Sequence, residues 1–417
     1  MSAKYSRIIS TGSALPAARI TNEDLARRLA ADGIETSDEW IRTRTGIEAR
    51  RFVNGTTETT TTLAAAAAQK ALEGGGVDPK TIDLIIVATT TPDQVFPSTA
   101  AAVQRLIGAA GCAAFDVQAV CAGFIYALNA ADAMLRAGPY QRALVIGAET
   151  MSRVIDMKDR ATCVLFGDGA GAVVLEASAK PGILAARMYA DGSYDENVLG
   201  LTARIDHGEL CGRPYINMDG RQVFKLAVDG LTSSAQEVAV LAGVDPQDVD
   251  VYIPHQANLR IMTMVAKKLG IPDERMIKTV SEQGNTSAAS VPLALDEAVR
   301  SGKISDGSLV LLQAVGAGMA WGSAIGGGGR GCSPCAGAAN KAERLWKRIV
   351  SNTNYGTKGK NSCALHSYSP ARAASLSACF RVLPTMLSLR TIWLAPMLLS
   401  EKILSNSSQK VRRKCSA

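Results

Sequence analysis

Apolar segments rich in Val and Ile alternate with Ala-rich stretches along the first 325 residues of this 417-residue chain. The apolar segments predict strands at residues 82–88, 113–120, 143–147, 172–176, 249–254 and 309–314. The Ala-rich stretches predict helices at residues 59–73, 123–136, 220–242, 257–268 and 290–300. Strands that are apolar on both faces need cover on both faces, which is typical of an α/β protein.

The two halves of this pattern are similar to each other. The segment IDLIIVATTTP from Ile82 corresponds to VDVYIPHQAN from Val249, and ALVIGAE from Ala143 corresponds to SLVLLQAVGAG from Ser308. Such self-similarity indicates a duplicated α/β unit. We place the two halves at residues 1–178 and 179–326.

Residues 327–417 form a basic tail with no sustained helical or alternating period, which we expect to be disordered or only locally helical. From Gly331 to Ala417 the chain contains seven Lys, seven Arg and two Glu, a net charge of +12. Since the whole chain carries +7, the preceding 330 residues carry −5. The basic balance of the chain is therefore no argument that its body binds nucleic acid.

Several features indicate a cytoplasmic protein outside the membrane. The start, MSAKYSRIIS, lacks the apolar core of a secretory signal. The longest apolar run, residues 309–325, is interrupted by Gly316, Gly318 and Gly322, so a buried strand–turn–strand explains it better than a membrane span. In that compartment the nine cysteines are expected to be reduced thiols.

Cys121 lies between the apolar run AAFDVQAV and the helical pattern AGFIYALNAADAMLRAG, at a strand-to-helix turn. A thiol at the N-terminus of a helix meets the positive end of the helix dipole, which favours the thiolate. The position alone fits a nucleophile and a buried structural cysteine equally well. Cys112, Cys163 and Cys211 lack this context.

His255 and Asn285 are candidate partners of this thiol. His255 directly follows the predicted strand VDVYIP, the position in the second half that matches Cys121 in the first. Asn285, in QGNTSAAS, precedes a predicted helix, where Asn also serves as a turn former or cap. Together the three supply a nucleophile, an imidazole and an amide donor, although their spacing does not show that they meet.

Two motifs that could bind other ligands are less persuasive. GDGAGAVVLE, from Gly167, has glycines at alternate positions before a strand, so the dinucleotide fingerprint fails and tight backbone packing explains it better. Cys332-x-x-Cys335 and Cys363-x-x-His366 have zinc-ligand spacing within each pair, but no core pattern surrounds them. We expect no metal site.

Four segments, FDVQAVCAGF, IPHQANLRI, GNTSAAS and FGDGAGAVVLEA, strongly resemble β-ketoacyl-acyl-carrier-protein synthase III, the initiating condensing enzyme of type II fatty acid synthesis. The resemblance runs from about Lys4 to Ile325. It implies the thiolase fold, in which two similar α/β halves stack as a five-layer αβαβα sandwich.

The resemblance also implies a mechanism. The residue matching Cys121 attacks a short acyl-CoA, acetyl-CoA above all, and keeps the acyl group. Malonyl-acyl-carrier protein then loses carbon dioxide while the residues matching His255 and Asn285 stabilise the enolate, and the carbanion attacks the acyl-cysteine. Backbone N–H groups of Cys121 and of Ala317, in the loop after Gly316, would hold each tetrahedral oxyanion, and Phe96 would limit acyl length.

Binding residues follow from the same resemblance. The motif TSDEWIRTRTGI implies that Trp40 stacks on the adenine of coenzyme A, with Arg44 and Arg160 helping to hold the nucleotide. A basic surface for the acidic carrier protein is implied at Lys225, Arg260, Lys267 and Lys268. The family forms homodimers and needs no cofactor, because acyl-CoA is a substrate.

Two departures from the family leave alternatives open. The loop that commonly reads GGGF is here Gly316, Ala317, Gly318 and Met319. If Ala317 required a positive φ, its Cβ would cost about 1 kcal/mol, and Met319 would soften the pocket. The chain also continues beyond the usual end, by frameshift, read-through or a genuine appended segment. A thiolase-fold acyltransferase of secondary metabolism and a weakened or inactive homologue remain alternatives.

Overall fold

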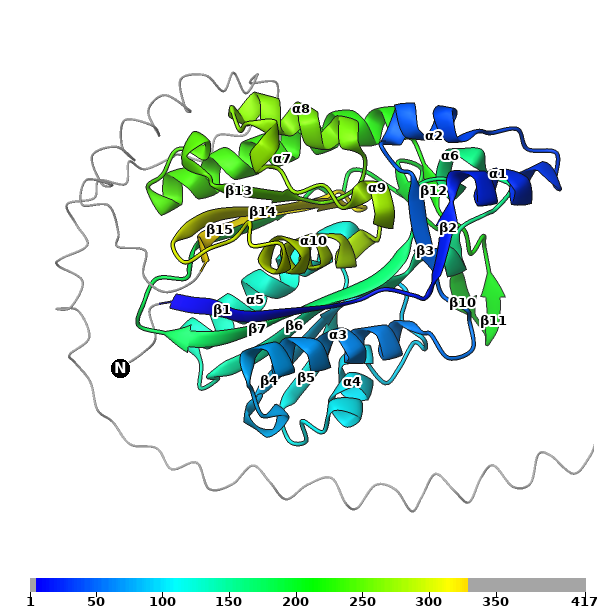
Figure 1. Cartoon of the computed structure of the whole chain (residues 1–417). Coiled ribbons are helices and arrows are strands. Elements are labelled where there is room, and N and C mark those ends of the chain that lie inside the picture. Colours follow the sequence, from blue (N-terminus) through cyan, green and yellow to red (C-terminus); the bar gives the residue numbers. More distant parts are fainter. Residues whose placement is uncertain (1–4, 329–417) are drawn as a thin grey trace, which may run out of the picture. The chain divides into compact units, whose positions relative to one another are not determined.

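The computed structural model describes residues 5–328, whose strands form two main sheets (Figure 1). The first sheet has the order β1 (Tyr5–Ala14), β7 (Asp168–Ser178), β6 (Arg142–Thr150), β4 (Leu84–Ala88) and β5 (Ala113–Val117). The second has the order β13 (Val251–Pro254), β14 (Ser308–Gly316), β15 (Ala320–Gly328) and β8 (Ile183–Ala190).

Helices cover both faces of each sheet, as the apolar strands require (Figure 1). Between the sheets lie α5 (Gly123–Ala137) and α10 (Ser290–Arg300). The outer face of the first sheet carries α3 (Thr60–Gly75) and α4 (Thr99–Ile107), and that of the second carries α7 (Gly220–Ala242) and α8 (Leu259–Leu269). The predicted five-layer αβαβα arrangement is confirmed.

The two sheets have matching connectivity. From β1 to β5 the successive pairings are antiparallel, antiparallel, parallel and parallel, and from β8 to β13 they are antiparallel, antiparallel and parallel. The fifth position of the second sheet is reduced to a parallel bridge between Tyr252 and Met276. In this match β4 corresponds to β13 and β6 to β14, the pairs whose sequences are similar.

The expected boundary near residue 178 falls in the connection between β7, which ends at Ser178, and β8, which begins at Ile183 in the other sheet. Residues 5–328 nevertheless belong to one compact unit. The basic tail, with its Cys-x-x-Cys and Cys-x-x-His pairs, lies outside the described residues.

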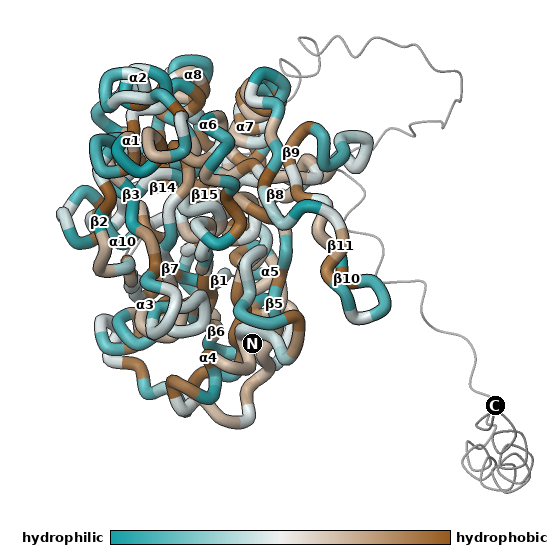
Figure 2. Tube along the Cα trace, turned by 90° about the vertical axis from the view of Figure 1, so that its right-hand side faces the viewer, coloured by the Kyte–Doolittle hydropathy of each residue, from teal (hydrophilic) through white to brown (hydrophobic). Residues whose placement is uncertain are grey.

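Smaller elements surround one end of the sandwich. These are β2 (Ala18–Thr21), α1 (Asn22–Ala30), α2 (Asp38–Thr45), β3 (Ala49–Phe52), α6 (Arg160–Cys163), β9 (Leu199–Gly200), β12 (Asn217–Met218) and α9 (Val280–Gln283). A ribbon of β10 (Arg204–Asp206) and β11 (Glu209–Cys211) projects from the body (Figure 2). Its paired residues Ile205 and Leu210 are exposed.

All six predicted strands and five predicted helices are present; the helices at 220–242 and 290–300 have the predicted bounds, and the other elements have shifted ends. Residues 309–325 form a strand–turn–strand, and no helix of the described residues is long and apolar enough to cross a membrane. The sequence missed β1 and β8, because β1 mixes Ser, Thr and Arg with its apolar residues. The helix expected from residue 257 starts at Leu259, since the side chain of Asn258 caps it by accepting from the N–H of Arg260.

Glycines let the central helix α10 and the turn before it approach the first sheet closely. A Cβ at Gly147 would lie 2.3 Å from the carbonyl oxygen of Ala288, and one at Gly171 would lie 2.7 Å from the nitrogen of Leu293. A Cβ at Gly167 would lie 2.3 Å from the carbonyl oxygen of Gln283. The alternate glycines of GDGAG therefore serve backbone packing, as predicted.

We expect Gly147→Ala to lower the free energy of unfolding by about 1–3 kcal/mol, because its methyl group would overlap backbone atoms that cannot rotate away. Urea unfolding followed by circular dichroism measures the change. Gly192→Ala is the matched control, since a Cβ there has no neighbour within 4 Å. Equal stability of the two variants would contradict the packing argument.

Candidate active site

A cavity of about 450 Å³ is lined by residues of both halves, among them Cys121, His255 and Asn285. Its remaining walls are mainly apolar and come from several short elements, including β9 and β12 and the first turns of α7. The structure thus brings together three residues that are 134 and 30 positions apart along the chain. An apolar pocket with a few convergent polar groups is the usual form of a binding site.

Cys121 lies between β5 and α5, in the single 3₁₀ turn Val120–Ala122 that precedes the helix. Val120 has a φ of 47°, a strained conformation for a β-branched residue that turns the chain into this position. Cys121 is only 5% exposed, and burial raises the pKa of its thiol to about 12, although the nearby Ser287 hydroxyl lowers it. The resting side chain is therefore a neutral thiol, and the thiolate expected from the helix position is corrected.

His255 lies just beyond β13, where its N–H donates to the carbonyl oxygen of Gln313 on β14 at 2.7 Å. Its Nδ1 atom is 2.6 Å from the hydroxyl of Ser290, and its Nε2 atom has no hydrogen-bond partner within residues 5–328. Burial lowers the pKa of His255 to about 3. The imidazole is neutral at physiological pH and can present one N–H to the cavity.

Asn285 is held by its backbone, because its N–H donates to Leu165 at 2.8 Å and its carbonyl accepts from Gly167 at 3.0 Å. Its side-chain oxygen accepts from the N–H of Ser287 at 2.9 Å. With the oxygen engaged, the amide nitrogen is the end left for the cavity, and no partner for it lies in the described part of the chain. Asn285 is thus prepared to donate.

Gly316 and Ala317 form the loop opposite Cys121. A Cβ at Gly316 would lie 2.8 Å from the nitrogen of Cys121, so only glycine allows the two backbones to meet. Ala317 lines the cavity and has no positive φ, whereas the neighbouring Gly318 has a φ of 113°. The alanine is therefore unstrained, so this position gives no steric reason to expect a weakened enzyme.

Within the single chain, neither Phe96 nor Met319 lines this cavity. Phe96 is 81% exposed on the loop after β4, and its expected role in limiting acyl length stays a prediction. Met319 is buried in the core that surrounds α7, where its carbonyl accepts from Asp191, and it does not soften the pocket. β15 is also not truncated, since its pairing with β14 continues to Gly328 opposite Ser308.

The comparisons with known proteins agree with this geometry. Residues 115–192 match the model of 3-oxoacyl-[acyl-carrier-protein] synthase III, and residues 240–326 match the model of the C-terminal part of the same family. The structure of 3-oxoacyl-[acyl-carrier-protein] synthase III from Aquifex aeolicus is 48% identical, with a TM-score of 0.72, over 78% of this chain and 100% of that one. This chain belongs to the 3-oxoacyl-[acyl-carrier-protein] synthase III family.

Other members of this similarity group differ in their biological setting. The synthase III of Thermus thermophilus is 40% identical over 78% of this chain and 100% of its own, with a TM-score of 0.72. The priming β-ketosynthase of the R1128 polyketide pathway is 36% identical over 79% of this chain and 98% of its own, with a TM-score of 0.74. The chain is therefore a condensing acyltransferase of the synthase III family.

In this synthase, Trp40, Arg44 and Arg160 meet at one surface. The guanidinium carbons of Arg44 and Arg160 each lie 4.6 Å from the centre of the Trp40 ring. Ser37 caps α2 by accepting from the N–H of Trp40, and a Cβ at the terminal Gly46 would lie 2.6 Å from Leu259 of α8. The caps thus hold this aromatic platform beside α8, whose cap Asn258 lines the cavity.

The expected carrier-protein residues are exposed on the two outer helices of the second sheet. Lys225 lies on α7, and Arg260, Lys267 and Lys268 lie on α8, which carries no acidic residue. Lys268 is paired with Asp229 of α7 at 3.2 Å. This pairing partly neutralises the basic surface at one point.

Sequence reasoning missed two buried polar residues of this synthase, Glu149 and Ser287. Glu149 ends the apolar segment ALVIGAE, and Ser287 follows Asn285 by two positions. The sequence feature that could have identified Glu149 is a carboxylate at the end of a fully apolar segment. Within residues 5–328 there is no group of three or more His, Cys, Asp and Glu residues that could hold a metal ion.

The neutral state of His255 predicts a specific acid sensitivity. In the unfolded chain this imidazole takes up a proton near pH 6.5, whereas in the folded chain it does so only near pH 3. The contribution of His255 to the free energy of unfolding is therefore complete above pH 6.5 and is lost as the pH falls toward 3. Between pH 7 and pH 5, wild type should lose about 2 kcal/mol more unfolding free energy than His255→Asn. Urea unfolding at both pH values measures this difference, and equal losses would show that His255 is protonated in the fold.

Proposed function

We propose that this synthase condenses a short acyl-CoA, with acetyl-CoA as the first candidate, with malonyl-acyl-carrier protein and so initiates fatty acid synthesis. The observation that carries the proposal is the convergence of one thiol and two free N–H donors, from Cys121, His255 and Asn285, on a single cavity. Its substrates place the enzyme in the cytoplasm. The steps need no bound cofactor, because acyl-CoA enters as a substrate.

In the first half-reaction Cys121 attacks the thioester carbon of acyl-CoA, and coenzyme A leaves. The negative oxygen of the tetrahedral intermediate is held by the N–H groups of Cys121 and Ala317. This assignment is supported by Gly316, which lets its own backbone, next to Ala317, lie close to the backbone of Cys121. Fixed donors aimed at a developing oxyanion in a water-poor site are an effective source of rate enhancement.

In the second half-reaction malonyl-acyl-carrier protein loses carbon dioxide, and its thioester oxygen becomes an enolate. His255 and Asn285 donate to that oxygen. Neutral donors suit this step, because a carboxylate at the same place would repel the charge. For Nε2 of His255 to donate, Nδ1 must accept, so the Ser290 hydroxyl at 2.6 Å is assigned as the donor to Nδ1.

Coenzyme A is assigned to the platform of Trp40, Arg44 and Arg160, where the adenine would replace one guanidinium on the indole. The acidic carrier protein is assigned to Lys225, Arg260, Lys267 and Lys268, the exposed basic residues of α7 and α8. Both surfaces adjoin elements that line the cavity, namely the start of α7 and the cap of α8.

We also propose a homodimer through β5. Within the described residues β5 forms an edge of its sheet, with one side of its backbone unpaired. Val95 and Phe96, on the loop after β4, are exposed large apolar residues. An unprotected strand edge invites pairing with a second chain. Light scattering should give twice the monomer mass, and a monomer at micromolar concentration would refute the dimer.

A second candidate function is the priming of a polyketide or another secondary metabolite. The similarity to the R1128 priming β-ketosynthase favours it. The same Cys, His and Asn set would serve a different acyl donor or acceptor. Trials with acetyl-CoA against longer and branched acyl-CoA donors, and with fatty acid against polyketide carrier proteins, distinguish the two functions.

The two half-reactions distinguish the role of Cys121 from the roles of His255 and Asn285. With radiolabelled acetyl-CoA, wild type should form labelled acyl-enzyme and, after addition of malonyl-acyl-carrier protein, labelled ketoacyl product. Cys121→Ser should form no acyl-enzyme. His255→Ala and Asn285→Ala should still be acylated but should lose condensation by about a hundredfold or more, since each removes one enolate donor. Absence of acyl-enzyme in wild type with every short acyl-CoA would refute the proposal.

A variant of each binding surface serves as the control for a variant of the other. Trp40→Ala should raise KM for acyl-CoA by about tenfold, as loss of a stacking surface does, and leave KM for malonyl-acyl-carrier protein within about twofold. Lys267→Glu should do the reverse, with an effect that shrinks at high salt. Steady-state kinetics with each substrate varied in turn measure both values. If both variants affected both substrates equally, the two assignments would be wrong.

A further inference from the structure

The described contacts place a buried carboxylate one hydroxyl away from the nucleophile. Glu149 is fully buried at the end of β6, and its Oε1 accepts from the hydroxyl of Ser287 at 3.1 Å. The turn that carries Ser287 packs against the turn that carries Cys121, and the Ser287 hydroxyl lies near enough to the thiol to lower its pKa. Cys121, Ser287 and Glu149 therefore lie in succession, from the thiol to the carboxylate.

The surroundings hold Glu149 in a single place. Its other oxygen, Oε2, accepts from the backbone N–H groups of Thr90 and Thr91, both at 3.1 Å, and from the Thr91 hydroxyl at 2.5 Å. Thr91 in turn accepts at its hydroxyl from the N–H of Thr150 at 2.9 Å. With Oε2 engaged in this way, Oε1 is the oxygen that faces the site.

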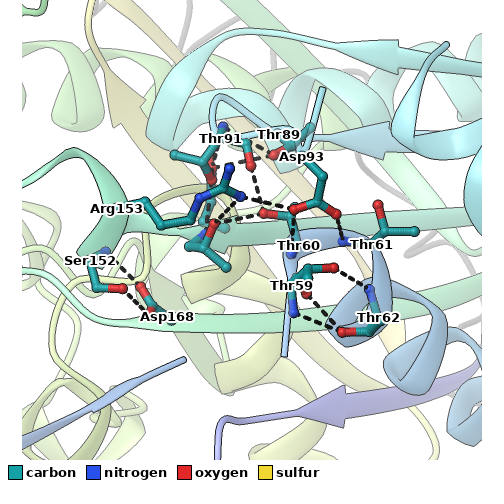
Figure 3. A network of polar contacts seen from close by, with 12 residues as sticks. Thr59, Thr60, Thr61, Thr62, Thr89, Thr91, Asp93, Ser152, Arg153 and Asp168 are labelled. Atoms are coloured by element: carbon teal, nitrogen blue, oxygen red, sulfur yellow. Dashed lines mark hydrogen bonds and ion pairs between the residues drawn. The ribbon is translucent and has the colours of Figure 1, made fainter. Parts of the chain in front are cut away.

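A wider polar network fixes the residues that hold Glu149 (Figure 3). Thr60, at the start of α3, donates its hydroxyl to the carbonyl oxygen of Thr91 at 2.6 Å. Asp93 accepts from the N–H of Thr61 at 2.9 Å and pairs with Arg153 at 2.9 Å. The loop after β4 is thereby tied to α3 and to the end of β6, so Glu149 cannot turn away from Ser287 without breaking these contacts.

Ser287 is also built into place. It is fully buried, and its φ of 50° is a conformation that residues other than glycine adopt only where the surrounding structure imposes it. Its N–H donates to the side chain of Asn285, while its hydroxyl donates to Glu149 and lies near the thiol of Cys121. A hydroxyl can accept one proton while it donates another, so it can pass a proton along this chain.

We propose that Glu149, acting through the hydroxyl of Ser287, takes up the proton that Cys121 loses during acylation and returns it during condensation. This role rests on the proposed function and adds a positioning residue to it. The neutral buried thiol needs such an acceptor, because His255, the imidazole that lines the same cavity, has its Nδ1 engaged by Ser290 and its Nε2 assigned as an N–H donor.

The protons balance over the two half-reactions. As the sulfur of Cys121 bonds to the thioester carbon, its proton passes to Ser287 and the hydroxyl proton of Ser287 passes to Glu149. Coenzyme A leaves as a thiolate and takes a proton from water. In the condensation the carbanion left by carbon dioxide bonds to the acyl carbon, and the sulfur of Cys121 leaves as a thiolate. Glu149 then returns its proton through Ser287.

The acidity of Glu149 suits this exchange. Burial raises its pKa to about 7, against the hydrogen bonds from Thr91 and Ser287 that lower it, and a base with a pKa near the working pH is the most effective. The charged and titratable groups around it are the thiol of Cys121 and, beyond Thr150, the pair of Arg153 and Asp93. Asp168 lies opposite Thr150 on β7.

The simple electrostatic alternative predicts the opposite sign. The negative charge of Glu149 raises the pKa of the Cys121 thiol, so its removal alone would make the thiol more acidic and more reactive. Under the relay, removal of the carboxylate deprives the thiol of its proton acceptor and makes it less reactive. The direction of the change in reactivity therefore decides between the two.

The test follows alkylation of Cys121 by iodoacetamide between pH 5.5 and 9, with the modified peptide quantified by mass spectrometry. In wild type the rate should rise with pH and level off above about pH 7, where Glu149 is ionised. Glu149→Gln and Ser287→Ala should each lose this plateau and react about tenfold more slowly at pH 7.5. Faster alkylation of Glu149→Gln, or an unchanged profile in both variants, would overturn the relay.

Two further variants separate the relay from a general structural effect. Asp132→Asn removes another buried carboxylate, which lies on α5 and accepts from the hydroxyl of Ser6 at 2.8 Å. This variant should keep the wild-type dependence of the alkylation rate on pH. The double variant of Glu149→Gln and Ser287→Ala should be no slower than either single variant, because the two residues act as one unit. Additive losses, or the same loss in Asp132→Asn, would refute the relay.

Alkylation needs neither acyl-CoA nor carrier protein, so it is independent of the proposed function. A wild type that fails to form acyl-enzyme but shows the predicted alkylation profiles would refute the function and retain the relay. A wild type that condenses its substrates while Glu149→Gln is alkylated faster would do the reverse.

Discussion

Two backbone hydrogen bonds join the halves of the molecule at the point where the site forms. Asn285 donates to Leu165 and accepts from Gly167, so the segment before α10 runs beside the segment before β7. A Cβ at Gly167 would overlap the carbonyl oxygen of Gln283, and Gly284 has a φ of 64°. Because these bonds hold the backbone and Ser287 engages the side-chain oxygen, only the amide nitrogen of Asn285 is left to face the cavity.

Burial shifts every titratable group of the site toward its neutral form. The pKa of the Cys121 thiol is raised, that of the Glu149 carboxyl is raised, and that of the His255 imidazole is lowered, each mainly by loss of water. A cavity without strong fixed charges of its own is suited to chemistry in which negative charge appears only on the substrate oxygen. In such a cavity, neutral hydrogen-bond donors stabilise the charge on the substrate oxygen as it forms, and no fixed charge of the protein repels it or has to be neutralised first.

Arg50 links the surroundings of the Trp40 platform to the same centre. Its buried guanidinium has no carboxylate partner among residues 5–328, and it donates to the side-chain oxygen of Asn22 and to the carbonyl of Val164, both at 2.8 Å. Burial lowers the pKa of Arg50 to about 10, which leaves it charged at neutral pH. Its Cβ also lies against the positions where Gly167 and Gly284 would carry side chains. One residue thus connects α1, α6 and the crossing that holds Asn285.

The sequence by itself determined the apolar strands, the Ala-rich helices, their duplication and the place of Cys121 before α5, because these depend on local periodicity and on which residues avoid water. It also contained the resemblance that brought His255 and Asn285 together, and it misplaced Met319 because a sequence motif does not show whether a side chain is buried. The tertiary structure alone decided that the thiol is neutral, that Ala317 is unstrained, and that Glu149 meets Ser287 across 138 positions. Those outcomes depend on desolvation and on contacts between distant segments, which exist only after the layers have packed.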